Sequence, residues 1–121
     1  MPATRLPMHR YLWLLVMLIA LAYGLRLFRL DAVPLRGDEA YAVRYWADDP
    51  IQVLTNLAEE EPHPVGTFFM FYAWKQTAGA SEFAMRYLPL LGSIIGVTAV
   101  ASLARRLLRD DRVALLAALL W

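Results

Sequence analysis

Two short acidic groups lie in the polar stretch between the apolar parts of the sequence. Residues 36–41 contain the adjacent acids Asp38 and Glu39. Residues 59–64 contain three consecutive glutamates, followed by a histidine between two prolines. Transfer of a group to a hydroxyl needs a base that takes the hydroxyl proton and a cation that holds a phosphate leaving group. Both kinds of side chain occur in or near these two runs.

The residue types in these runs provide candidates for a base, for metal ligands and for phosphate contacts. Asp38 is a candidate general base for an acceptor hydroxyl. Glu61 and His63 offer carboxylate and imidazole ligands to a divalent metal, directly or through water. A guanidinium suits bidentate contact with phosphate, and the candidate arginines are Arg36, Arg44 and Arg86.

Each of these residues also has a purely structural interpretation. Asp38 can cap a short helix, and residues 59–61 can form a solvated acidic face. His63, between prolines, is typical of a turn. Arg44 can pair with Asp48, one helical turn later. Local sequence leaves both interpretations open.

The composition predicts an integral membrane protein. Of the 121 residues, 60% are hydrophobic, whereas a soluble domain has about 45–50%. The mean hydropathy is +0.42. A net charge of +1 gives no support for nucleic-acid binding. The absence of cysteine excludes disulfides, thiolate metal sites and cysteine nucleophiles.

The apolar blocks predict three spanning helices, over residues 11–30, 88–104 and 113–121. The third is about half of the roughly 20 residues that a bilayer needs, so we expect the chain to be the N-terminal part of a longer polytopic protein. The first block also fits a signal peptide, with a basic start and small residues near its end. The later apolar blocks favour a retained span, because a secreted soluble protein would not carry them.

Residues 31–87 are predicted to be an outer loop with short helices at the membrane surface, which makes the fold class all-α. Two amphipathic helices are expected over 39–47 and 51–58. The aromatic-rich block 65–78 is predicted to be an interfacial or half-inserted helix. Expected helix-end signals are caps at Asp38, Ser81 and Asp111 and a stop at Gly79.

Charge predicts the topology. Four arginines follow the second span, whereas Arg86 stands alone before it. The positive-inside rule puts the basic end in the cytoplasm. The loop 31–87 then lies outside, the N-terminus lies inside, and the location is the cytoplasmic membrane. If residues 65–78 crossed the membrane completely, this assignment of the two sides would no longer hold.

Three runs, taken in order, resemble the GT-C membrane glycosyltransferases. Residues 30–41, Leu-Asp-Ala-Val-Pro-Leu-Arg-Gly-Asp-Glu-Ala-Tyr, look like the first outer loop of that superfamily. Residues 61–64, Glu-Pro-His-Pro, precede an aromatic helix, as in its second motif. Residues 81–89 and the span ending at residue 107 are the third match. The most similar members are the protein O-mannosyltransferases and the bacterial aminoarabinose lipid A transferase.

The resemblance implies transfer of a sugar from a polyprenyl-phosphate donor to a hydroxyl of a lipid, glycan or protein acceptor on the outer face. It implies that Asp38 is the base and that Glu39 is the second acid of the pair. It also implies that Glu61 lies near a divalent metal ion, which would be the cofactor. The candidate catalytic residues are thus Asp38, Glu39 and Glu61, the candidate metal ligands are Asp38, Glu61 and His63, and the candidate substrate-binding residues are Arg36, Tyr41, Arg44, His63 and Arg86.

The sequence departs from the family pattern after the second motif. Val65 stands where a second proline is usual, and Gly66 where a bulky residue is common. The family's further spans and outer domain are not in this chain, so we expect the chain alone to be inactive. The alternatives are a non-catalytic membrane protein of transport or assembly and an inactive truncated relative.

Overall fold

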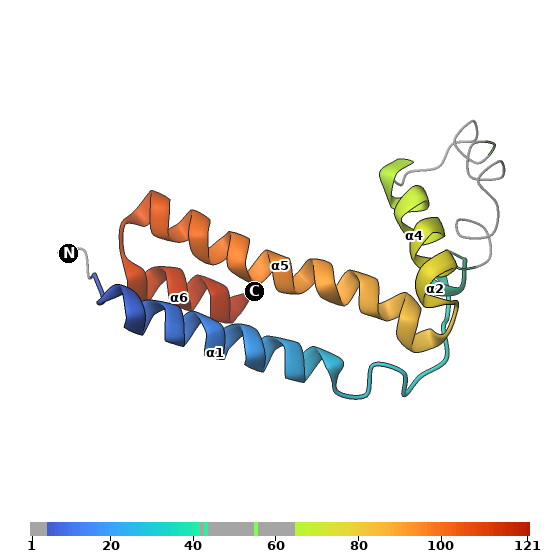
Figure 1. Cartoon of the computed structure of the whole chain (residues 1–121), viewed down its shortest axis with the longest axis horizontal. Coiled ribbons are helices and arrows are strands. Elements are labelled where there is room, and N and C mark those ends of the chain that lie inside the picture. The colour runs from blue at the N-terminus through green and yellow to red at the C-terminus, as the bar shows by residue number, and fades with distance from the viewer. Residues whose placement is uncertain (1–4, 42, 44–54, 56–64) are drawn as a thin grey trace. The chain divides into compact units, whose positions relative to one another are not determined.

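The computed structural model describes residues 5–41, 43, 55 and 65–121, and this part of the chain is helical (Figure 1). The helices are α1 (Met8–Leu27), α2 (Asp38–Tyr41), α4 (Val65–Ala78), α5 (Glu82–Leu108) and α6 (Asp111–Leu120). The all-α prediction is confirmed for these residues. Most residues of the predicted helices 39–47 and 51–58 lie outside the described residues.

The chain forms two compact units. Unit 1 comprises residues 1–28 and 90–121, and unit 2 comprises residues 29–89. Helix α5 contributes its first turns to unit 2 and its longer remainder to unit 1. The residues predicted to do chemistry belong to unit 2.

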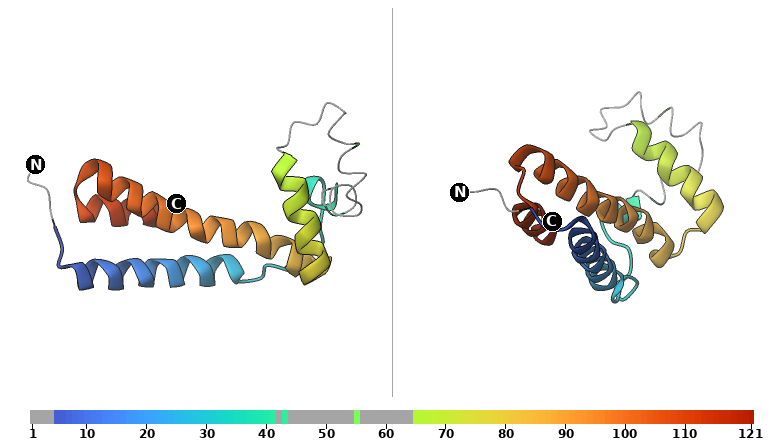
Figure 2. Two further views of the ribbon diagram at one scale, coloured as in Figure 1. Left: turned by 45° about the horizontal axis from the view of Figure 1, so that its top comes forward. Right: turned by 60° about the vertical axis from the view of Figure 1, so that its left-hand side comes forward.

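Among the helices that the structure describes, two are long and apolar enough to cross a membrane. Helix α1 has 20 residues and α5 has 27, which correspond to about 30 and about 40 Å of helix, and both are unbroken in Figure 2. A hydrocarbon core is about 30 Å thick. Only 6% of the apolar window of α1 and 17% of that of α5 is buried inside the chain. These two helices are therefore candidate membrane spans.

The bounds of the candidate spans differ from the predicted ones at their ends. Helix α1 ends at Leu27, because Phe28 is extended and Arg29 has a φ of +58°. Helix α5 begins at Glu82 and continues through Pro89. Its start is set by Ser81, whose Oγ accepts a hydrogen bond from the Ala84 N–H at 3.1 Å. Ser81 is thus confirmed as a helix cap.

Helix α4 has the predicted bounds, and a glycine closes it. Gly79 has a φ of +82°, and its N–H donates to the Lys75 carbonyl at 3.0 Å. A left-handed residue after the last turn is the usual glycine helix stop. Helix α4 has 14 residues, below the length of a full span.

The cap of α6 is Asp110, so the prediction of Asp111 was wrong. The Asp110 carboxylate accepts hydrogen bonds from the N–H groups of Arg112, at 2.8 Å, and Val113, at 3.3 Å. Asp111 lies one residue further along, inside the first helical turn. A cap must have non-helical backbone, which Asp110 has with φ −123° and ψ 121°.

The core of unit 1 is built from small side chains. Val97 and Ala101 of α5 meet Ala118 of α6, and all three are buried. Partly buried residues of α1 pack against them, namely Leu15, Leu18, Ile19 and Ala22. Small residues let helix backbones approach closely, and Figure 1 shows α6 beside α1.

A buried aspartate ties the ends of unit 1 together. The Asp111 side chain is fully buried, and its Oδ1 accepts a 2.8 Å hydrogen bond from Arg105 Nε. Its Oδ2 accepts a 2.8 Å hydrogen bond from the backbone N–H of Leu6, 105 residues earlier. The Arg105 guanidinium also lies 4.2 Å from the ring centre of Tyr11. The bond from Arg105 lowers the pKa of Asp111 below its ordinary value.

Candidate functional site

Arg86, in the first turns of α5, holds the acidic loop of unit 2. Its Nε donates to Glu39 Oε1 at 3.1 Å, and its Nη2 donates to Glu39 Oε2 at 2.7 Å. This is a bidentate ion pair between residues 47 positions apart. The pair orients Glu39 toward α5, and the neighbouring Asp38 is not part of it.

The same guanidinium also binds the backbone of the loop. Its Nη1 donates to the carbonyls of Leu30, at 3.0 Å, and Val33, and its Nη2 donates to the carbonyl of Pro34 at 3.4 Å. The Arg86 side chain is only 16% exposed. One arginine thus fixes both the start of the loop and the helix that ends it.

Asp38 lies in the first turn of α2 and is exposed. The turn before it is set by Gly37, which has a φ of +53°. The Tyr41 N–H donates to the Gly37 carbonyl at 3.0 Å. Helix α2 begins at Asp38 itself, and within the described part of the chain its carboxylate accepts no backbone cap bond. Asp38 therefore presents its carboxylate to the surroundings of the loop.

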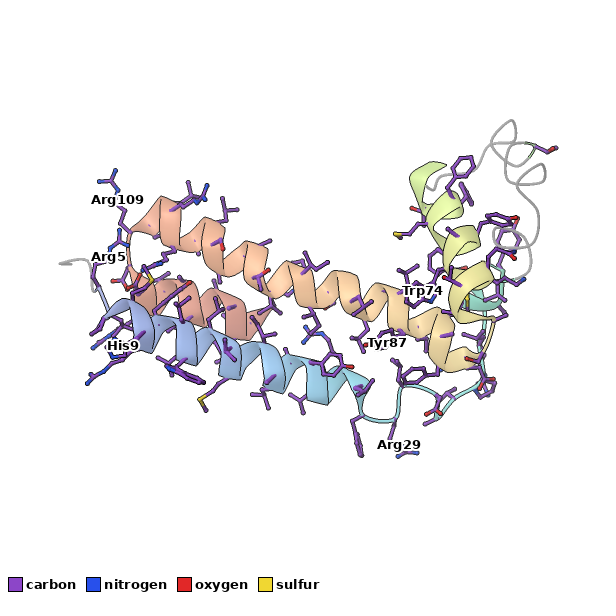
Figure 3. All side chains as sticks on the ribbon, in the orientation of Figure 1. Arg5, His9, Arg29, Trp74, Tyr87 and Arg109 are labelled. Atoms are coloured by element: carbon purple, nitrogen blue, oxygen red, sulfur yellow. The ribbon has the colours of Figure 1, made fainter. Side chains whose placement is uncertain are left out.

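Aromatic side chains fix α4 against the start of α5. The Trp74 indole donates to the Ala84 carbonyl at 2.7 Å, and its ring stacks with Tyr87 at a centroid distance of 6.3 Å. Tyr87, which is labelled with Trp74 in Figure 3, also stacks with Phe83 at a centroid distance of 5.5 Å. Lys75 of α4 donates to the Val43 carbonyl at 3.2 Å. Trp74 thus packs against α5.

A small cavity lies beside the Arg86–Glu39 pair. Its volume is about 60 Å³, and its lining includes Leu35, Phe71 and Met85. Such a volume holds a few water molecules and is too small for a sugar. A donor or acceptor would therefore have to meet Asp38 at the exposed side of the loop.

The structure brings together part of the predicted site. Arg36, Asp38, Glu39 and Tyr41 belong to one loop and short helix, and Arg86 reaches Glu39 from α5. Arg44, Glu61 and His63 lie outside the described residues, so the predicted metal and second-acid roles stay predictions. Within the described residues, no group of three or more histidines and acids is close enough to hold a metal ion.

Sequence reasoning missed the structural role of Arg86. It identified this arginine as a phosphate contact, whereas five hydrogen bonds of its guanidinium go to the loop. The sequence showed only that Arg86 is a single arginine immediately before the apolar stretch 88–104. That signal does not reveal a partner 47 residues away.

The Arg86–Glu39 pair predicts a pH-dependent loop. Hydrogen bonding from Arg86 holds the pKa of Glu39 below its ordinary 4.5. The stabilisation is therefore complete above pH 4.5 and is lost as the pH falls through the lower folded-state pKa. Because the Glu39 side chain is 49% exposed, we expect an effect below about 1 kcal/mol. Protease protection of residues 30–39, followed against pH, measures it.

The control for this prediction is Glu39→Gln. The variant lacks the titrating group, so its protection should vary less with pH in the same acid range. An identical pH profile in the variant and the parent chain would show that another group controls the loop.

Comparison of the chain with protein-family models, with curated proteins and with solved structures finds no match.

Proposed function

We propose that the chain is the N-terminal part of a membrane glycosyltransferase, which moves a sugar from a polyprenyl-phosphate donor to an acceptor hydroxyl. One observation carries the proposal. Asp38 is exposed at the end of a loop that Arg86 anchors through five hydrogen bonds. A catalytic base needs this combination of an accessible carboxylate and a fixed backbone.

The proposed step is an inverting displacement. The Asp38 carboxylate takes the proton of the acceptor hydroxyl while that oxygen attacks the anomeric carbon of the sugar. The bond from the anomeric carbon to the phosphate oxygen breaks, and the polyprenyl phosphate leaves with the electron pair. A cation stabilises the charge that develops on the leaving phosphate.

Two arginines of unit 2 divide the supporting roles in this proposal. Arg86 is a positioning residue, because its guanidinium is occupied by Glu39 and the loop carbonyls. Arg36 is exposed and lies two residues from Asp38. Its guanidinium forms no hydrogen bond with any other residue that the structure describes. Arg36 is thus the better-placed phosphate contact of the two.

The two candidate spans support a location in the membrane. With the basic end of α5 in the cytoplasm, the loop 31–87 lies on the outer side, where the proposed transfer takes place. A divalent metal held by Asp38, Glu61 and His63 remains a prediction, and the step above does not depend on it. The acceptor is a lipid, a glycan or a protein.

Asp38→Asn in the intact protein tests the proposal. We expect transfer to fall by about 10²–10⁴-fold, because asparagine cannot accept the proton. The measurement is transfer from a labelled polyprenyl-phosphate sugar in isolated membranes, with the amount of inserted protein determined in parallel. Asp31→Asn is the matched control, since Asp31 is also an exposed acid of this loop.

Two outcomes contradict the proposal. Undiminished transfer by Asp38→Asn removes Asp38 from its central role. No transfer by the unmodified intact protein favours the alternatives, a non-catalytic protein of transport or assembly or an inactive relative.

A further inference from the structure

A basic cavity lies in unit 1, and none of the residues proposed for transfer lines it. It has a volume of about 500 Å³, within the range of small-molecule sites. Helices α1 and α5 line it, together with the residues just before α1. Four of the lining residues are arginines, namely Arg5, Arg105, Arg106 and Arg109. Figure 3 shows Arg5 and Arg109 at the same end of this unit.

The four arginines are not equivalent. Arg105 is held by Asp111 and lies over Tyr11, so it forms a fixed wall of the cavity. Arg5 is 3.7 Å from Asp111, and its side chain is 55% exposed. Arg106 and Arg109 are exposed and form no ion pair within the described chain. Asp111 offsets one of the four charges, so the cavity keeps a clear excess of positive charge and attracts an anion.

The cavity changes character along the helices. Its charged end is formed near Arg5 and Arg109, whereas its other end is formed by Leu12, Leu15 and Ser102. Arg109 comes seven positions after Ser102 and directly after the end of α5, a separation of about 10 Å at the helical rise per residue. A cavity with arginines at one end and leucine side chains at the other matches an amphipathic anion rather than a free inorganic ion.

We propose that this cavity binds an anionic phospholipid, with the phosphate at Arg106 and Arg109 and the first part of an acyl chain against Leu12 and Leu15. Basic pockets between membrane helices are known positions for acidic lipid head groups. In the proposed topology the cationic mouth lies at the cytoplasmic surface, where such lipids are enriched. The inference rests on α1 and α5 being in the bilayer, and it is independent of transfer at Asp38.

The test measures phospholipid that stays bound to the chain. The chain is reconstituted in phosphatidylcholine vesicles containing a minority of phosphatidylglycerol, extracted with detergent and weighed by native mass spectrometry. For Arg106→Gln/Arg109→Gln we expect retained phosphatidylglycerol to fall about tenfold. The control is Arg10→Gln/Arg112→Gln, which removes two exposed charges near the same end but outside the cavity. We expect a fall of at most about twofold for this control.

A second pair of variants separates a lipid from a free phosphate without changing charge. Ser102→Phe fills the apolar end and should lower phosphatidylglycerol retention, whereas Leu103→Phe, at an exposed residue that does not line the cavity, should not. If the double arginine variant fails to fold, this pair of variants still tests whether the cavity binds the lipid.

Three outcomes overturn the proposal. Equal loss of lipid from both arginine pairs indicates diffuse attraction of charge rather than a site. Unchanged retention in Ser102→Phe, together with displacement of the lipid by soluble glycerol phosphate, assigns the cavity to free phosphate. A chain that inserts into vesicles but shows no preference for phosphatidylglycerol defeats this inference alone, whereas a chain that does not insert defeats the proposed function as well.

Discussion

Replacement of Asp111 by alanine is expected to lower the free energy of unfolding by about 3 kcal/mol. Asp111 is fully buried, and its removal leaves Arg105 and the Leu6 N–H without the acceptor that they share. Loss of one partner of a buried ion pair usually costs 3–5 kcal/mol. We expect the lower end because the Arg105 side chain is 22% exposed and can be rehydrated. Denaturant unfolding in mixed detergent micelles measures the change.

Asp110→Ala is the matched control, since it removes an aspartate from the same turn. It deletes the cap of α6 and should cost about 1 kcal/mol. A loss in Asp111→Ala no larger than in Asp110→Ala would contradict the anchoring role of Asp111.

The destabilisation by Asp111→Ala should also depend on pH. The bond from Arg105 depresses the folded-state pKa of Asp111 below 3.8, so its stabilisation is complete above that pH. It is lost as the pH falls through the folded-state value. The difference between the variant and the parent chain should therefore shrink in strong acid.

Arg86→Ala is expected to release the loop of unit 2 and to cost about 2–3 kcal/mol. The guanidinium makes two bonds to Glu39 and three to backbone carbonyls, so alanine removes the donor of five hydrogen bonds at once. Hydrogen bonds that involve charged groups contribute more than neutral ones. Water replaces part of the lost hydrogen bonding to Glu39, because the Glu39 side chain is half exposed. Limited proteolysis with mass spectrometry should reveal new cleavage within residues 30–39.

Two further variants make this test specific. Arg36→Ala, in the same loop, removes an exposed guanidinium that hydrogen-bonds to no described residue, and its effect should stay within about 0.5 kcal/mol. Arg86→Lys should restore part of the protection, because lysine supplies the charge but not the planar fork. If Arg86→Ala lowers transfer while residues 30–39 remain resistant, Arg86 contacts phosphate instead of positioning the loop.

Local patterns predicted α4 and the signals at its C-terminus and at the start of α5 closely. The aromatic block 65–78 matches α4 to the residue, and Ser81 and Gly79 act as the predicted cap and stop. Such signals can be recognised in a sequence because a cap bond or a left-handed residue acts within one turn of its own helix. The choice between Asp110 and Asp111 failed because adjacent aspartates carry the same local signal.

The pairings that hold the site and the basic cavity could not be predicted in this way. Asp111 meets Leu6 across 105 residues, and Arg86 meets Glu39 across 47. A charged side chain has no intrinsic preference among distant partners, and its partner depends on which helix ends the packing brings together. Residue types thus specified an apolar, helical chain with a candidate base at residue 38. The folded arrangement determined that Arg86 anchors the loop beside that acid and that Arg5, Arg105, Arg106 and Arg109 line one cavity.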